Sequence, residues 1–203
     1  MLHWECLYAS RGEVPVAGLD EAGRGPLAGP VVAAAVILPP EDCYPVALID
    51  SKKLTPARRE AAFEFLRDLP GTAIGVGIVE AEEIDRINIL QATRKAMLAA
   101  LAALRVAPLA ILIDAVFLPG LKIPQQNLVR GEEASVSIAA ASIIAKVTRD
   151  RIMVEADRRH PAYGFARHKG YGTPQHLAAL KEHGPSPIHR QTFRPVRECA
   201  HRL

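Results

Sequence analysis

The sequence predicts an α/β fold in which helices flank a mixed sheet. Apolar runs of strand-like composition cover residues 14–20, 30–38, 73–79 and 109–114. Residues 137–159 instead repeat small and apolar side chains every three to four positions, as a long helix does. Of the 203 residues, 49% are hydrophobic and only 5% are aromatic, so aliphatic side chains can fill a layered core.

Start and stop signals predict two helices. One precedes the third predicted strand, and the other lies between the third and fourth. Thr55 precedes Pro56, and a capping hydroxyl followed by proline at the first helical position favours a helix start. A second helix is expected to begin at Ile84 or Ile89 and to end by Leu104, because a proline precedes the next strand.

The C-terminal part of the chain is expected to be helical. A helix fits residues 173–183, which open on a threonine and a proline and are followed by Gly184. No repeat, low-complexity tract or long linker divides the chain. We therefore expect a single domain over residues 1–203, with about 173–203 as a C-terminal helical extension.

Composition and targeting signals favour a cytoplasmic protein. The formal net charge of +3 is a mild bias toward polyanions and does not by itself establish nucleic-acid binding. The three cysteines are far apart, so a disulfide framework or thiolate zinc site is not indicated and a reducing cytosol is the simpler inference. We see no secretory signal, and Arg105 and Pro108 interrupt the most apolar stretch, 97–113, before it is long enough to span a membrane.

Two adjacent carboxylates follow the first predicted strand. Asp20 and Glu21 stand where that strand ends, and Gly23, Arg24 and Gly25 come soon after. Hard divalent cations prefer clustered carboxylate oxygens, and an arginine between glycines can hold a phosphate or a sugar. An ordinary acidic turn explains an isolated Asp-Glu pair equally well. A metal site therefore requires further ligands from a second strand.

The strand predicted at 109–113 supplies such a candidate, because it ends in Asp114. If the two strands are parallel neighbours, Asp20 and Asp114 project into the same crevice at their carboxyl ends. Aspartate is also a common turn residue, and the helix dipole alone favours Glu132 and Glu133 in the first turn of the following helix. The pattern leaves both the ligand and the ordinary interpretation open.

Basic side chains and histidines accompany these carboxylates. Each basic residue can contact a phosphate backbone, although each alone is more often a solvated charge. They are Lys52, Lys53, Arg58, Arg59, Lys146, Arg149 and Arg151. The spacing of His160, His168, His183 and His189 lacks a recognised metal-ligand pattern, so we expect these histidines to be structural or close to phosphate.

Several separated motifs occur together in this chain. They span Asp20 to Val32, Asp50 to Leu54, Asp114, Ser137 to Asp150, and His168 to Thr173. In this order and approximate spacing they resemble bacterial ribonuclease HII along nearly the whole chain, which is far more specific than any single pattern. The resemblance implies a ribonuclease H-like fold with a five-stranded mixed sheet flanked by helices.

The resemblance also implies an activity. Ribonuclease HII is an endonuclease that hydrolyses the RNA strand of RNA–DNA hybrids and cuts at single ribonucleotides embedded in duplex DNA, leaving 5′-phosphate and 3′-hydroxyl ends. Two Mn²⁺ or Mg²⁺ ions are implied, one activating water and the second stabilising the departing oxygen. No side-chain nucleophile is then needed. Ribonucleotide removal in DNA replication and repair is the implied role.

The resemblance assigns metal-binding roles to individual residues. Asp20, Glu21 and Asp114 match the metal-binding carboxylates of the family. The family usually has an aspartate where this chain has Glu132, and we rank Glu132 before Glu133 as the fourth ligand.

The resemblance assigns further residues to substrate binding. Residues 23–25 match the family's segment whose backbone contacts the ribose 2′-hydroxyl and whose arginine contacts the phosphate. Tyr171 matches the tyrosine that stacks on the sugar after the ribonucleotide. The expected substrate-binding residues are Gly23, Arg24, Gly25, Lys52, Lys146 and Tyr171.

Two other functions, a sliding-clamp interaction and the oligomeric state are weighed against the sequence. Ribonuclease HIII usually has lysine at the position of Arg24 and an added N-terminal domain, so it fits less well. A non-catalytic hybrid-binding protein would gain nothing from carboxylates beside a polyanion. Residues 191–203 lack an aromatic pair typical of a sliding-clamp peptide, so the sequence does not support a clamp interaction. A monomer is expected.

Overall fold

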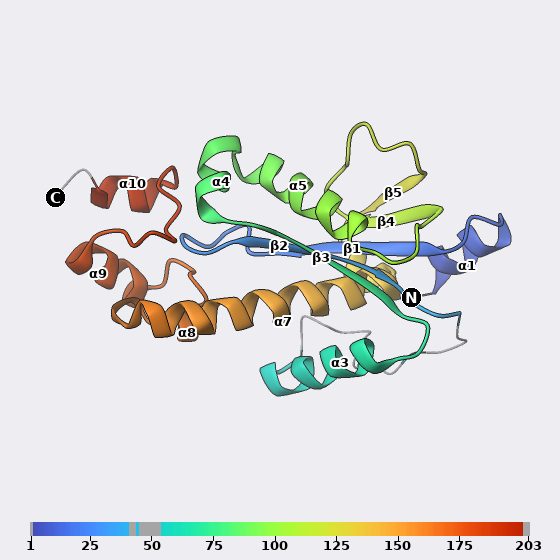
Figure 1. Cartoon of the computed structure of the whole chain (residues 1–203), viewed down its shortest axis with the longest axis horizontal. Helices are drawn as coiled ribbons and strands as arrows, with labels where there is room; N and C mark the ends of the chain where they lie inside the picture. The colour runs from blue at the N-terminus through green and yellow to red at the C-terminus, as the bar shows by residue number, and fades with distance from the viewer. Residues whose placement is uncertain (1, 41–43, 45–53, 201–203) are drawn as a thin grey trace.

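A computed structural model describes residues 2–40, 44 and 54–200 of the chain. A five-stranded mixed sheet lies between two layers of helices (Figure 1). Its strands are β1 (Val16–Ala22), β2 (Val31–Ile37), β3 (Ala73–Val79), β4 (Ala110–Asp114) and β5 (Gln125–Leu128). They lie in the order β3-β2-β1-β4-β5, with β1 antiparallel to β2, β2 antiparallel to β3, and β4 parallel to both β1 and β5.

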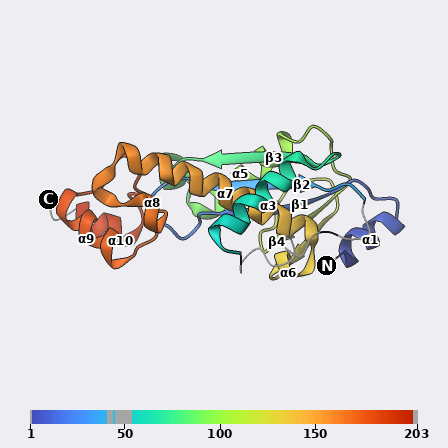
Figure 2. The same cartoon turned by 90° about the horizontal axis from the view of Figure 1, so that it is seen from below.

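Helices cover both faces of this sheet and extend beyond one end. The helices are α1 (His3–Ser10), α3 (Pro56–Asp68), α4 (Ala81–Ile87), α5 (Ile89–Ala102), α6 (Gly131–Ala134), α7 (Val136–Arg159), α8 (Phe165–His168), α9 (Pro174–His183) and α10 (Arg194–Ala200). Helices α4 and α5 lie on one face, and α7 and α3 lie on the other. Figures 1 and 2 both place α8, α9 and α10 at the end of the molecule opposite α1.

Alternating side chains on the central strands build two cores. Leu19 and Ile111 pack with Met97 of α5, whereas Ala34 and Val36 pack with α7 and α3 on the opposite face. Glycine allows α7 to lie directly on β1, because a Cβ at Gly18 would stand 2.1 Å from the Ser137 carbonyl carbon. The close approach positions the site, since α7 crosses the end of β1.

The predicted α/β fold is confirmed, with local differences. The four predicted strands and the helices at Thr55-Pro56, 137–159 and 173–183 are present within one or two residues. The helix expected to begin at Ile84 or Ile89 begins at Ile89 as α5, and residues near Ile84 form the separate helix α4. Asn88 causes the division, because it has a φ of 67° and its side chain caps α5 by accepting from the Leu90 and Gln91 N–H groups.

Candidate active site

The two central parallel strands each bring a carboxylate to the same edge of the sheet. Leu19 of β1 is paired with Ile113 of β4, so Asp20 and Asp114 follow at equivalent positions. The predicted pairing of these strands is therefore confirmed. Asp20 is only 6% exposed, its Oδ1 accepts the Glu21 N–H at 2.7 Å, and Ser142 of α7 donates a side-chain hydrogen bond to it.

The acidic side chains at this edge repel one another. Burial raises the pKa of Asp20 well above its ordinary value, and Glu21 and Asp114 add to this effect while the Ser142 hydrogen bond opposes it. Burial also raises the pKa of Glu21, which Arg24 lowers and Asp114 raises. Three carboxylates that disfavour each other's charge form a site whose ionised state a cation would stabilise.

Asp114 organises the segment that carries the fourth predicted ligand. Its Oδ1 accepts the Gly131 N–H at 2.9 Å, directly after Arg130 in a left-handed conformation with a φ of 56°. The short helix α6 begins at Gly131. Glu132 therefore lies in its first turn, immediately after the residue whose N–H binds Asp114.

The environments of the two candidate glutamates differ sharply. Glu132 is 2% exposed, whereas the Glu133 side chain is 52% exposed and forms an ion pair with Arg130. A one-turn helix turns successive side chains in different directions, so adjacent acidic residues need not share a role. The burial of Glu132 supports ranking it before Glu133.

The donor set suits a hard divalent cation. Glu21 Oε2 is buried and has no hydrogen-bond partner among the described residues, and the four predicted ligands offer only oxygen atoms. Within the described residues, no three His, Cys, Asp or Glu side chains are already gathered closely enough to surround an ion. Hard divalent cations can bind through one or two carboxylates together with waters and substrate phosphate oxygens, so a cation here would need such further oxygen ligands.

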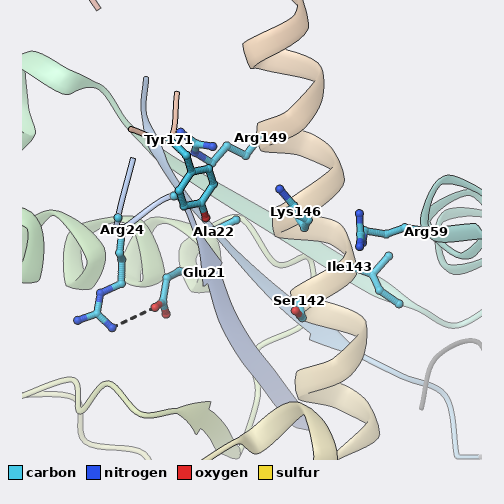
Figure 3. Close-up of a pocket in the computed structure, with 11 residues that line it drawn as sticks. Glu21, Ala22, Arg24, Arg59, Ser142, Ile143, Lys146, Arg149 and Tyr171 are labelled. Carbon is cyan, nitrogen blue, oxygen red and sulfur yellow. Dashed lines mark hydrogen bonds and ion pairs between the residues drawn. The ribbon is translucent and has the colours of Figure 1, made fainter. Parts of the chain in front are cut away.

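A pocket of about 440 Å³ opens beside these carboxylates, between the end of β1 and α7. Figure 3 shows Glu21 and Arg24 on one side of it, Lys146 and Arg59 on the other, and the Tyr171 ring between them. The lining also includes Gly23, Gly25, Ser142 and Arg149. All the predicted substrate-binding residues within the described part of the chain therefore line this one pocket. Lys52 lies outside the described residues.

The shape of the loop requires glycine at position 23, whereas position 25 has room for a Cβ. Gly23 has a φ of +99°, and a Cβ there would stand 2.0 Å from Arg149 Nε and 2.7 Å from the Pro30 carbonyl oxygen. At Gly25 a Cβ would lie 3.8 Å from the Tyr171 ring, so any larger side chain would enter the space beside that ring. The backbone of the loop is therefore open to a ligand in the pocket.

Two arginines behave differently from the sequence-based expectation of phosphate contacts. Arg149 is buried and donates to the carbonyl oxygens of Pro30, Lys169 and Ala28 at 2.9, 3.0 and 3.1 Å. Arg151 pairs with Glu60 and Glu64. The sequence places both on a helix near a cleft, but only the packing shows which groups they face.

Sequence reasoning missed two further contributors. It assigned no role to Ser142, although this residue hydrogen-bonds Asp20. It assigned no role to Arg190, which is fully buried beneath the glycine loop. The signal for Ser142 was available, since a hydroxyl within an alanine-rich helix face is the one polar group that can reach a buried carboxylate.

Comparison with known proteins adds a decisive observation. The family model described as Ribonuclease HII matches residues 17–196. The chain belongs to the ribonuclease HII family. It is a metal-dependent endonuclease of a family that cleaves the RNA of RNA–DNA hybrids. The Geobacillus thermodenitrificans ribonuclease HII is 60% identical over 193 residues, which cover 95% of this chain and 73% of the relative.

Solved structures agree with the ribonuclease HII assignment and with its fold. The ribonuclease H2 of Pyrococcus horikoshii OT3 matches with a TM-score of 0.78 and 30% identity, covering 92% of this chain and 97% of that one. Bst-RNase HIII in complex with Mn²⁺ shares the fold at 19% identity, with a TM-score of 0.67 and coverage of 94% and 71%. No helix in the described part of the chain has the length and apolarity needed to cross a membrane.

Proposed function

We propose that this chain, as one catalytic domain, hydrolyses the RNA strand of RNA–DNA hybrids and incises duplex DNA at single embedded ribonucleotides. The products are a 5′-phosphate and a 3′-hydroxyl, and catalysis uses two Mn²⁺ or Mg²⁺ ions. One observation carries the proposal: Asp20 and Asp114 end adjacent parallel strands beside a pocket that Arg24, Lys146 and Tyr171 line.

The carboxylates hold the ions, with Asp20, Glu21, Asp114 and Glu132 as ligands. When bound, the ions lower the pKa of the attacking water and stabilise the leaving oxygen. Ser142 fixes one orientation of the Asp20 carboxylate through its hydrogen bond. The Gly131 N–H does the same for Asp114, so both aspartates are oriented before a cation arrives.

The pocket residues hold the nucleic acid. Arg24 and Lys146 reach phosphate oxygens, and in the free protein they pair with Glu21 and Asp150 at 3.2 and 2.7 Å. Tyr171 is 46% exposed, so its ring is available to stack on a sugar. The backbone of residues 23–25 contacts the 2′-hydroxyl, the group that distinguishes RNA from DNA. Lys52 belongs to this proposed set and lies outside the described residues.

The cellular setting is part of the proposal. Three widely spaced cysteines support a reducing cytoplasm, and ribonucleotide removal in DNA replication and repair is the role that such an incision serves. The proposed assembly is a monomer on its duplex substrate.

Cleavage of matched duplexes tests the function. The substrates are an RNA–DNA hybrid, a DNA duplex with one ribonucleotide, and the same duplex made only of DNA, each with Mg²⁺, with Mn²⁺ and with chelator. We expect metal-dependent cutting of the first two and none of the third. Binding of the ribonucleotide-bearing duplex without metal-dependent incision would refute the catalytic proposal.

A further inference from the structure

Arg190 lies beneath residues 23–29, the glycine loop, and its side chain binds three carbonyl groups of this loop. Its Nη2 donates to the Gly23 oxygen at 2.5 Å, and its Nη1 donates to the Arg24 oxygen at 2.9 Å. Its Nε and Nη2 both donate to the Gly29 oxygen, at 3.0 and 2.9 Å. The side chain is fully buried. One planar guanidinium therefore fixes both ends of the loop at once.

This grip determines where the loop N–H groups point. Among the described residues the only cis peptide bond joins Val14 and Pro15, so the peptides after Gly23 and Arg24 are trans. In a planar trans peptide the C=O and the N–H point in opposite directions. Because Arg190 holds the Gly23 and Arg24 oxygens inside the protein, the N–H groups of Arg24 and Gly25 face away from it, on the side of the pocket that these residues line.

These two N–H groups are available to a ligand. Within the described part of the chain, neither the Arg24 nor the Gly25 N–H donates a hydrogen bond. A guanidinium bound to the carbonyl of a peptide polarises that peptide and strengthens its N–H as a donor. The loop therefore offers two adjacent, strengthened donors to an oxygen atom in the pocket.

The cation beneath the loop has no ion-pair partner among the described residues. Asp85 attracts its charge without forming an ion pair, and Arg149 opposes it. Burial, followed by Arg149, lowers the pKa of Arg190 to about 9, so it remains charged at neutral pH. Lysine would keep the charge, but a single ammonium group cannot span three carbonyl oxygens in the plane that the guanidinium occupies.

We propose that Arg190 is a positioning residue that sets the preference for ribose: it holds the Gly23 and Arg24 carbonyls so that the Arg24 and Gly25 N–H groups meet the 2′-oxygen of the substrate. The inference rests on the proposed function. Arg190 does not touch the reacting atoms, and its effect on the preference passes through the loop backbone.

A double-mutant cycle tests this role, with Arg190→Lys as the protein change and removal of one 2′-hydroxyl as the substrate change. Dissociation constants are measured in chelator by fluorescence anisotropy, for duplexes with and without the single ribonucleotide. Wild-type protein should prefer the ribonucleotide, and we expect the variant to reduce that preference about tenfold, which is about 1.4 kcal/mol of coupling. An equal loss of affinity for both duplexes would show that the loop binds phosphate or that Arg190 is only structural, and would overturn the proposal.

A matched control separates positioning from stability. Tyr163→Phe removes a buried hydrogen bond of 2.8 Å to the Gly184 oxygen in the same C-terminal region and leaves the Arg190 hydrogen bonds to the Gly23 and Arg24 carbonyls in place. It should lower the melting temperature and leave the ribose preference unchanged. A comparable loss of preference in this control would count against a specific role for Arg190.

Wild-type protein provides a second measurement that does not depend on variant folding. Amide NMR signals of Arg24 and Gly25 should shift more with the ribonucleotide-bearing duplex than with its all-DNA match. Equal shifts with both duplexes would overturn the inference. If wild-type protein has no ribose preference and makes no incision, the proposed function fails; if it has both and the cycle shows no coupling, only the role of Arg190 fails.

Discussion

Arg24 Nη1 lies 3.2 Å from Glu21 Oε1, so the predicted phosphate-binding arginine pairs with a predicted metal ligand in the free protein. The two side chains are 43% and 12% exposed, and Figure 3 shows their ion pair as a dashed line among the residues that line the pocket. A substrate phosphate would compete with Glu21 for the guanidinium. Nucleic-acid binding and exposure of a carboxylate oxygen to a cation are therefore linked at this pair.

Replacing Arg24 should strengthen cation binding by the free protein. Arg24→Gln removes the competing positive charge, and the effect expected for a partly exposed pair is about 0.2–1 kcal/mol, or up to roughly fivefold in Mn²⁺ affinity. Isothermal titration with Mn²⁺ in the absence of nucleic acid measures it. Arg194→Gln, which breaks the exposed pair with Glu198 far along the chain, serves as the control. Equal Mn²⁺ affinities in wild type and Arg24→Gln would contradict the prediction.

Neutralising Asp20 should stabilise the metal-free protein while removing activity. Asparagine keeps an oxygen that can accept from the Glu21 N–H, and it ends the burial of a charge and its repulsion by Glu21 and Asp114, which together raise the pKa of Asp20. A gain of about 1 kcal/mol would raise Tm by about 2–4 °C for a chain of this size. Mn²⁺ should raise Tm in wild type more than in Asp20→Asn, because a ligand that binds the native state stabilises it. A lower Tm for the variant in chelator would instead indicate a structural role.

Two glycines at close helix contacts should have different effects on activity. A Cβ at Gly18 would stand 2.1 Å from the Ser137 carbonyl carbon on α7, and one at Gly77 would stand 2.0 Å from the Ala96 oxygen on α5. Each change to alanine should destabilise the fold by about 1–3 kcal/mol or more, measured by urea unfolding. Only Gly18→Ala displaces the helix that carries Ser142, so only it should lower kcat/KM of the folded protein. The same activity loss in Gly77→Ala would argue against this.

The sequence predicts the elements whose signal is local. Asp20 and Asp114 could be placed together because apolar runs end in a carboxylate, and parallel strands deliver their ends to one edge. Strand β5 lacked such a signal, since Gln125–Leu128 is mostly polar and is a strand through its pairing with β4.

Other features depend on contacts across long stretches of chain. The role of Arg190 arises from carbonyl groups more than 160 residues earlier. The choice between Glu132 and Glu133 depends on burial, and both have the same charge in the sequence. Arg149 also has no local pattern that separates a carbonyl-binding arginine from a phosphate-binding one.

Acid should destabilise the protein through the buried His189. Its Nδ1 accepts from the Ser186 N–H at 2.9 Å, and its Nε2 lies 2.9 Å from His176 Nε2. Burial, and then His176, lower the pKa of His189 from 6.5 to about 4. The unfolded chain therefore binds more protons between these values, so stability falls as pH decreases from 6.5 toward 4, by at most about 3 kcal/mol.

Urea unfolding between pH 4 and 7.5 measures this dependence. In His189→Asn an amide oxygen can accept the Ser186 hydrogen bond without a titrating ring, so the variant should lose much of the slope between pH 6.5 and 4. His183→Asn is the control, because its side chain is 40% exposed. Identical slopes in wild type and His189→Asn would contradict the prediction. The comparison between variants cancels the opposite contribution of Asp20, whose raised pKa makes protonation favour the native state.

The adjacent glutamates provide a matched pair for the fourth ligand. Glu132→Gln removes a negative charge from a side chain that is 2% exposed next to the Asp114 contact, and it should lower kcat about 100-fold, or roughly 3 kcal/mol, with little change in duplex affinity. Glu133→Gln breaks only the surface pair with Arg130, so it should change kcat by no more than about twofold. Single-turnover cleavage and Mn²⁺ titration measure both variants. Since glutamine is neutral and similar in shape, Glu132→Gln should keep its Tm. A large activity loss with unchanged Mn²⁺ affinity would exclude Glu132 as a ligand, and a loss confined to Glu133→Gln would assign the fourth carboxylate to its exposed neighbour.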